Sequence, residues 1–216
     1  MGQDSVQRAR QLDDDVVLGM SLLAYGLTFD AAESGLPYAE AIACTERSGD
    51  LYIRVAILND AGFRGLETGN ISAARAYLEA ALRTAEAVGM LHLVARENLA
   101  KVLRAEGDLD GARSAFQDLA RNSRRVGDKR SLSGAMHGLA CLAADLGDWH
   151  RASALHGAAQ ALLDQIGSRM AAFDARRRQE SLDQLMAALG EKQLKHAYYQ
   201  GTVLSLDGAI DLALGQ

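Results

Sequence analysis

Residues 90–127 read MLHLVARENLAKVLRAEGDLDGARSAFQDLARNSRRVG and decide the fold class. Apolar residues recur at steps of three and four on both sides of Gly107, which is the pattern of two amphipathic helices. Gly107 and Gly127 stand where these helices are expected to end, because glycine adopts the left-handed conformation of a helix C-terminus at least cost. Asp108 is placed to accept hydrogen bonds from the first N–H groups of the next helix. The stretch therefore predicts two helices joined by a tight turn.

The same arrangement recurs along the chain. A glycine followed by Asp or Asn occurs at Gly69, Gly107 and Gly147, with spacings of 38 and 40 residues. A second glycine series lies 20 residues further on, at Gly89, Gly127 and Gly167, and Gly49 extends it toward the N-terminus. Two glycine series with a period near 40 predict a helix-turn-helix repeat. The expected helices cover residues 5–28, 36–48, 50–68, 71–88, 90–106, 109–126, 128–146, 149–166, 168–189, 191–200 and 205–214.

Small residues occupy corresponding positions, seven residues before and five residues after the turn glycines. They are Gly62, Ala74, Ala100, Ala112, Ala140 and Ala152. This spacing lets two antiparallel helices approach closely, and it resembles the small-residue pattern of tetratricopeptide (TPR) repeats. The period of 38–40 residues exceeds the 34 of that family, and the aromatic positions and terminal proline of its consensus are missing. The resemblance implies an all-α, TPR-like α-solenoid of about five antiparallel helix pairs.

We expect one domain over residues 1–216. A degraded N-terminal unit covers residues 1–49, three regular repeats cover 50–167, and a C-terminal capping unit covers 168–216. The only proline, Pro37, lies in the degraded unit, and this near-absence of proline favours helices joined by glycine turns. Ser205 precedes a short apolar run and is expected to cap a last helix that covers the edge of the stack.

Composition and charge exclude several classes of protein. The chain is 49% hydrophobic and 24% charged, which is typical of a globular domain rather than a disordered one. The formal net charge of -5 favours no direct binding to nucleic acid. The two cysteines, Cys44 and Cys141, suit a reducing compartment, no apolar run approaches the roughly 20 residues of a membrane helix, and no signal peptide is visible. We therefore expect a cytoplasmic protein that does not enter a membrane.

The C-terminal third resembles a second family. The matching segments are LHGAA at 155–159, LGE at 189–191, YQG at 199–201 and LSLDGAIDLA at 204–213. They resemble the end of the helical-repeat region in LuxR-type transcription regulators and relatives with a signalling ATPase module, some of which carry an adenylate-cyclase-like domain. The sequence has no G-x-x-x-x-G-K-[ST] phosphate loop and no DNA-reading helix-turn-helix after Leu214. The resemblance implies a sensor or interaction region of a bacterial regulator, either as part of a larger chain or standing alone.

No arrangement of residues points to catalysis, so we expect a non-catalytic protein without a cofactor. The five histidines form no compact zinc pattern, and no G-x-S-x-G elbow occurs. His137 and Cys141 are four residues apart on one expected helix, which could place two metal ligands on one face. The favoured interpretation is a polar groove residue beside a buried thiol, and no metal site is expected.

The TPR resemblance implies that the first helix of each pair lines a concave surface. In the small-residue register, that surface includes Asn59, Phe63, Glu97, Lys101, Arg104 and His137. Its mixed charge differs from the Lys/Asn set with which TPR clamps hold a terminal carboxylate. We expect it to bind a protein or peptide. Three alternatives stay open: a sensor that binds a small-molecule effector in a pocket lined by Phe63, Tyr52 and Met136, a self-associating scaffold such as a homodimer, and a plain solvent face.

Overall fold

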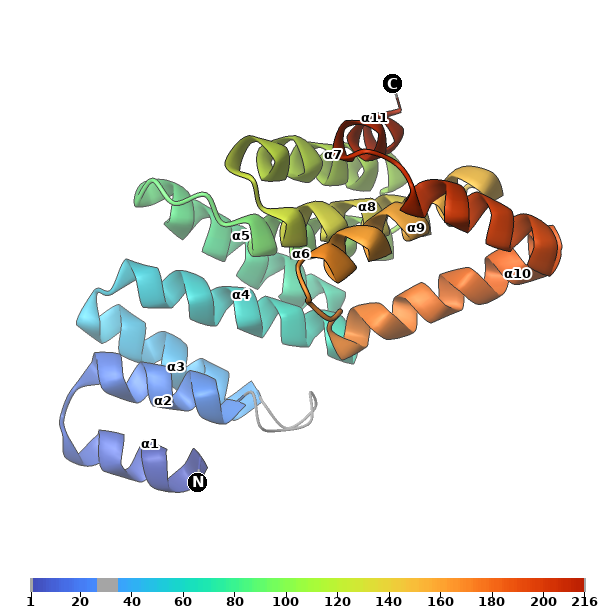
Figure 1. Cartoon of the computed structure of the whole chain (residues 1–216). Coiled ribbons are helices and arrows are strands. Elements are labelled where there is room, and N and C mark those ends of the chain that lie inside the picture. Colours follow the sequence, from blue (N-terminus) through green and yellow to red (C-terminus); the bar gives the residue numbers. More distant parts are fainter. Residues whose placement is uncertain (1, 27–34, 216) are drawn as a thin grey trace. The chain divides into compact units, whose positions relative to one another are not determined.

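The computed structural model describes residues 2–26 and 35–215, and its regular structure is entirely helical (Figure 1). Over these residues there are eleven helices and no strand, which confirms the expected all-α class. The helices are α1 (Gly2–Gln11), α2 (Asp15–Gly26), α3 (Gly35–Ser48), α4 (Leu51–Thr68), α5 (Ile71–Ala87), α6 (Leu93–Ala105), α7 (Leu109–Val126), α8 (Lys129–Asp145), α9 (Trp149–Gln165), α10 (Ala172–Thr202) and α11 (Leu206–Leu214).

Helices end at the glycines of the two series that the sequence shows. The turn glycines have φ angles between 60° and 84°, in the left-handed region that other residues rarely adopt. They are Gly49, Gly69, Gly89, Gly107, Gly127, Gly147 and Gly167. The Asp or Asn after a turn caps the next helix as expected: Asp108 Oδ1 accepts a hydrogen bond from the backbone N of Gly111 at 2.9 Å. The side chains of Asp50, Asn70, Asp128 and Asp148 cap α4, α5, α8 and α9 in the same way.

The single helix expected over residues 5–28 is wrong, because two helices, α1 and α2, take its place. Asp13 has a φ of 51°, which interrupts the helix. Asp14 Oδ1 accepts hydrogen bonds from the backbone N of Val16 at 2.9 Å and of Val17 at 3.1 Å. A side chain that caps N–H groups in this way starts a new helix, because a continuous helix would bond these groups internally. Residues 27 and 28 of the expected helix lie outside the described residues.

Other boundaries differ from the expected ones as well, and α10 begins at Ala172 rather than at residue 168. Helix α6 begins at Leu93, because His92 Nδ1 accepts a hydrogen bond from the backbone N of Ala95 at 3.1 Å and so caps it. Histidine is not among the usual capping residues, so the sequence pattern gave no sign of this start. The helices expected over 168–189 and 191–200 are the two arms of α10, which turns at Gly190 with φ 72° and ψ 163°. This backbone conformation is essentially restricted to glycine.

The contacts of the chain group into two compact units, Met1–Val102 and Leu103–Gln216. In the first unit, α2 packs on α3, and α4 packs along α5. One core cluster of this unit is formed by Val6, Leu22, Leu23, Tyr38, Ala41, Cys44, Ile57 and Ala61. Gly62 of α4 faces Leu78 of α5 so closely that a Cβ atom at this position would overlap the leucine side chain.

In the second unit, α8 packs against α7 and α9, and α9 packs against α10 (Figure 1). Two glycines set the approach of α9 and α10, because a Cβ atom on Gly157 would overlap the backbone carbonyl of Tyr198, and one on Gly201 that of Ala154. The last helix, α11, lies on α7 and α9 and is capped by Ser205, as the sequence predicts.

The small positions of the repeat are buried, in agreement with a packing role. Ala74, Ala100, Ala112, Ala140 and Ala152 each expose 0% of their surface, and Gly62 is also buried. Within the described residues, no helix has both the length and the apolar character that a bilayer span requires.

Candidate functional site

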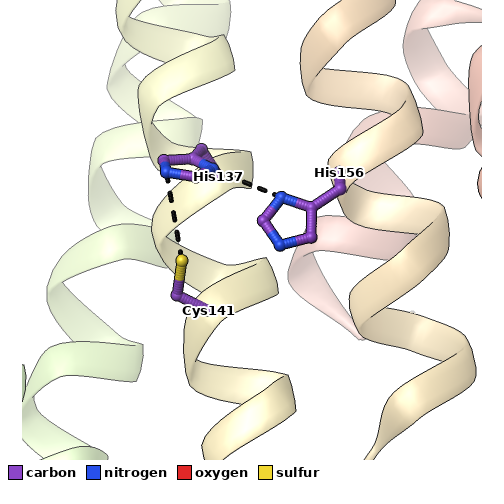
Figure 2. A group of neighbouring side chains, drawn as sticks. All are labelled: His137, Cys141 and His156. Atoms are coloured by element: carbon purple, nitrogen blue, oxygen red, sulfur yellow. Dashed lines mark hydrogen bonds between the residues drawn. The ribbon is translucent and has the colours of Figure 1, made fainter. Parts of the chain in front are cut away.

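Three buried side chains with metal-ligating or proton-transferring chemistry meet in the second unit. His137 and Cys141 come from α8 and His156 comes from α9, and their exposed fractions are 5%, 3% and 0%. Figure 2 shows His137 joined by a dashed line to each of the other two side chains. His137 Nδ1 lies 3.3 Å from His156 Nδ1, and Cys141 Sγ lies 3.9 Å from His137 Nε2. We call these three residues the His-Cys cluster.

Helix geometry explains why the three side chains meet. Residues four apart on a helix share a face, which brings Cys141 beneath His137. His137 lies ten residues before the turn glycine Gly147 and His156 lies nine residues after it. Two packed helices joined by a tight turn place such nearly equidistant positions side by side.

A continuous chain of polar contacts runs through the His-Cys cluster to a third helix. His156 Nε2 lies 2.9 Å from Oγ of Ser181, a residue of α10 that is also buried. Each imidazole can donate through one nitrogen and accept through the other. All three contacts can therefore be hydrogen bonds when each ring carries one proton. This holds whether donation runs from Cys141 toward Ser181 or in the opposite direction. Either direction leaves both rings neutral.

The surroundings favour the neutral forms of His156 and Cys141. Burial is the main cause that lowers the pKa of His156 well below its ordinary value, and the neighbouring His137, Arg178 and Arg104 lower it further. Burial also raises the pKa of the Cys141 thiol to about 11. A protonated thiol is a poor nucleophile, so Cys141 at neutral pH is not poised for covalent chemistry. It becomes a strong ligand only when a metal ion displaces its proton.

Two arginines bring positive charge near the cluster. Arg104 donates to both carboxylate oxygens of Asp145, from Nε at 2.6 Å and from Nη2 at 2.9 Å. Arg178 Nη2 donates to the hydroxyl of Tyr198 at 2.7 Å. Of these two contacts, only that of Arg104 pairs the cation with a carboxylate, because a hydroxyl carries no charge.

The structure distributes the expected groove residues over both units. Asn59, Phe63, Glu97 and Lys101 belong to the first unit. Asn59 is 7% exposed, and its Oδ1 accepts a hydrogen bond from Asn98 Nδ2 at 3.1 Å. Lys101 Nζ lies 2.8 Å from Glu97 Oε1, and both side chains are mostly covered, with 14% and 15% exposed. Phe63 is half-buried.

The remaining two groove residues, Arg104 and His137, belong to the second unit. Arg104 pairs with Asp145, as described above, and its side chain is 27% exposed. His137 is buried within the His-Cys cluster and does not present its ring to solvent. Of the six expected groove residues, Asn59 and His137 are therefore the two whose buried side chains a partner cannot reach without local movement of the structure.

The residues expected to line a small-molecule pocket have different surroundings. Tyr52 is 61% exposed, while Met136 is fully buried. Three open hollows of the described surface, each about 340 to 360 Å³, are lined by other residues. One lies between α1, α2 and α3 near Arg10 and Glu40, one lies beside α11, and one lies along α10.

Sequence reasoning paired His137 with Cys141 but missed His156 and Ser181. The signal that could have added His156 was its distance from Gly147, which nearly equals that of His137 on the other side of the turn. No comparable signal marks Ser181, because it lies on the long helix after the last regular repeat.

No protein-family model matches the chain, and no curated protein matches it.

Proposed function

We propose that this protein is a non-catalytic, TPR-like interaction domain of a cytoplasmic bacterial regulatory system, built from antiparallel helix pairs. It binds a protein or peptide partner through the face formed by the first helices of its repeats. The resemblance of the C-terminal third to LuxR-type and signalling-ATPase regulators suggests the regulatory context. The central support comes from side chains that lie one repeat apart in sequence and touch.

Two such contacts carry the proposal. Asn98 of α6 donates to Asn59 of α4, and the two residues are 39 positions apart. Arg104 of α6 pairs with Asp145 at the end of α8, and these residues are 41 positions apart. Both separations are close to the 38–40-residue period of the glycine turns, and each contact lies within one unit and joins first helices one repeat apart, which supports the proposed stack. Neighbouring first helices are what a stack of helical repeats requires.

The chemistry of the expected face points to a partner of mixed charge. Glu97 and Lys101 pair with each other, as do Arg104 and Asp145. A partner that supplied only negative charge would have to compete with Glu97 and Asp145 for these cations. A peptide or helix that offers both an acidic and a basic group can instead exchange partners with the Glu97–Lys101 pair of the first unit.

A site-specific photo-crosslinker tests this proposal in cells that make the protein. Phe63 on α4, within the expected face, is replaced by p-benzoylphenylalanine, which preserves an aromatic ring. The control places the same residue at Arg83 on α5, the second helix of its pair, where the side chain is 70% exposed. We expect a discrete crosslinked product from position 63 and none of the same mass from position 83.

The charge pairs provide the second part of the test. Lys101→Glu places two like charges four residues apart and should weaken the crosslink at position 63, while Arg83→Glu should leave it unchanged. Equal crosslinking from positions 63 and 83, or a product that is indifferent to Lys101→Glu, would contradict binding through this face.

A further inference from the structure

We propose that His137, Cys141 and His156 form a binding site for a single Cu(I) ion. Each residue offers one ligand atom, and these three atoms all lie within 4.8 Å of one another. The site is buried in the second unit and bridges α8 and α9, as Figure 2 shows. The inference goes beyond the proposed partner binding and does not depend on it.

The distances approach those of a metal centre, since the three ligand atoms lie within 4.8 Å of one another and binding would draw them closer. Metal–nitrogen bonds of about 2.0 Å and metal–sulfur bonds of about 2.3 Å place neighbouring ligand atoms roughly 3.3 to 3.8 Å apart. The Nδ1 atoms of His137 and His156 are 3.3 Å apart, and the sulfur of Cys141 is 3.9 Å from the His137 ring. Because one ion takes only one nitrogen of His137, that ring must rotate slightly or move its proton to the other nitrogen.

The ring of His156 is already held in the orientation that a ligand needs. When its Nε2–H donates to the Ser181 hydroxyl, which is 2.9 Å away, the lone pair of Nδ1 points toward the cluster. A hydrogen bond from the outer nitrogen of a ligating histidine fixes its tautomer and is a common feature of metal centres. Ser181 is thus a positioning residue of this site.

The donor set selects a soft metal ion. Two imidazole nitrogens and one thiolate suit Cu(I) and Zn(II), whereas Mg(II) and Ca(II) require oxygen ligands. Charge favours Cu(I) over Zn(II) here, because Cu(I) with one thiolate is neutral and Zn(II) with the same ligands keeps a positive charge. A buried positive charge is costly, and Arg104 and Arg178 already raise the positive potential at His156.

Binding is a ligand exchange without electron transfer. The Cys141 thiol loses its proton to solvent, and its sulfur forms a bond to Cu(I), while the two imidazoles stay neutral and bind through one lone pair each. The charge of the ion is balanced by the thiolate, and one proton is released for each ion that binds.

Anaerobic competition with bicinchoninate, which forms a coloured Cu(I) complex, tests the site in the full-length chain. We expect one high-affinity Cu(I) per chain. Cys141→Ser should lower the affinity at least about 100-fold, since it removes the only thiolate. Cys44→Ser is the matched control, because Cys44 is also buried but belongs to the first unit, and it should bind as the wild type does. Equal affinity in Cys141→Ser and the wild type, or loss only in Cys44→Ser, would overturn the proposal.

X-ray absorption at the copper edge of the wild-type chain gives a readout that does not depend on how a variant folds. We expect one sulfur and two nitrogen ligands around Cu(I). His156→Gln should remove one nitrogen, with the helix content of each variant checked by circular dichroism. A copper ion held by two sulfur atoms, or stoichiometric binding of Zn(II) without binding of Cu(I), would overturn it.

Discussion

At the residue scale, the absence of a side chain determines how closely α9 and α10 pack. Gly157 and Gly201 each face a backbone carbonyl of the other helix, and a backbone atom cannot move aside as a flexible side chain can. Each glycine lowers the helix propensity of its position by about 1 kcal/mol relative to alanine. The close approach that they permit places Ser181 of α10 beside His156 of α9.

Replacing Gly157 with alanine should therefore destabilise the protein despite the better helix propensity of alanine. We expect the free energy of unfolding to fall by about 2 to 3 kcal/mol, because the new methyl group overlaps the carbonyl of Tyr198 and forces the helices apart. Urea denaturation measures the change. The control is Gly208→Ala in α11, where the nearest atom is Ser205 Oγ at 3.4 Å, and this variant should be neutral or slightly stabilising. A stable Gly157→Ala variant would show that the two helices are not in close contact.

The neutral state of His156 gives a second prediction, for the chain kept metal-free with a chelator. The unfolded chain binds a proton at this histidine below its ordinary pKa of about 6.5, whereas the folded protein does not. The unfolded state thus binds more protons, and stability must fall as the pH falls. We expect a loss of about 1 kcal/mol between pH 6.5 and 5.5 from this group.

The corresponding measurement is urea denaturation at pH 7.5, 6.5 and 5.5 for the wild type and for His156→Gln, which cannot take up this proton. The difference in unfolding free energy between the two proteins should shrink as the pH falls. Parallel curves for the two proteins would mean that His156 becomes protonated in the folded state.

At the element scale, side chains that follow a glycine turn stabilise the start of the next helix. Asp108 Oδ1 accepts from the backbone N of Gly111, and four other turns use the same contact. Such a cap satisfies an N–H group that has no partner inside the helix.

Asp108→Ala should therefore lower the free energy of unfolding by about 1 kcal/mol. Asp110→Ala is a control from the same turn, because Asp110 is 92% exposed and forms only an i,i+3 ion pair with Arg113. That substitution should change stability by less than about 0.5 kcal/mol. Thermal or urea unfolding monitored by circular dichroism compares the two, and equal losses would contradict a capping role for Asp108.

The sequence predicted the elements well wherever glycine and Asp or Asn mark the turns. Helices α7 and α11 match the expected spans closely, since ordinary capping residues mark their ends. The sequence failed where an unusual residue caps a helix, as His92 does, and where Asp13 and Asp14 break an apolar pattern that continues on both sides. The third member of the His-Cys cluster was missed for a different reason, since it depends on the pairing of two helices rather than on a local motif.

At the scale of the whole molecule, the chain consists of two compact units whose helices begin and end with the same kinds of residue. In both units glycine ends helices, Asp or Asn caps the helices that follow most of these turns, and alanine occupies buried positions of the repeat. Polar contacts between residues 39 and 41 positions apart repeat the period of the turns. These contacts support the central proposal that, within each unit, first helices one repeat apart lie side by side.

A crystal structure of the full chain tests this claim most directly. It should contain α4 packed along α5 and α8 packed along α9, with Asn59 against Asn98 in the first unit and Arg104 against Asp145 in the second. Helices that pair in another order, or first helices that do not touch their equivalents one repeat away, would contradict the repeat architecture and the partner-binding face derived from it.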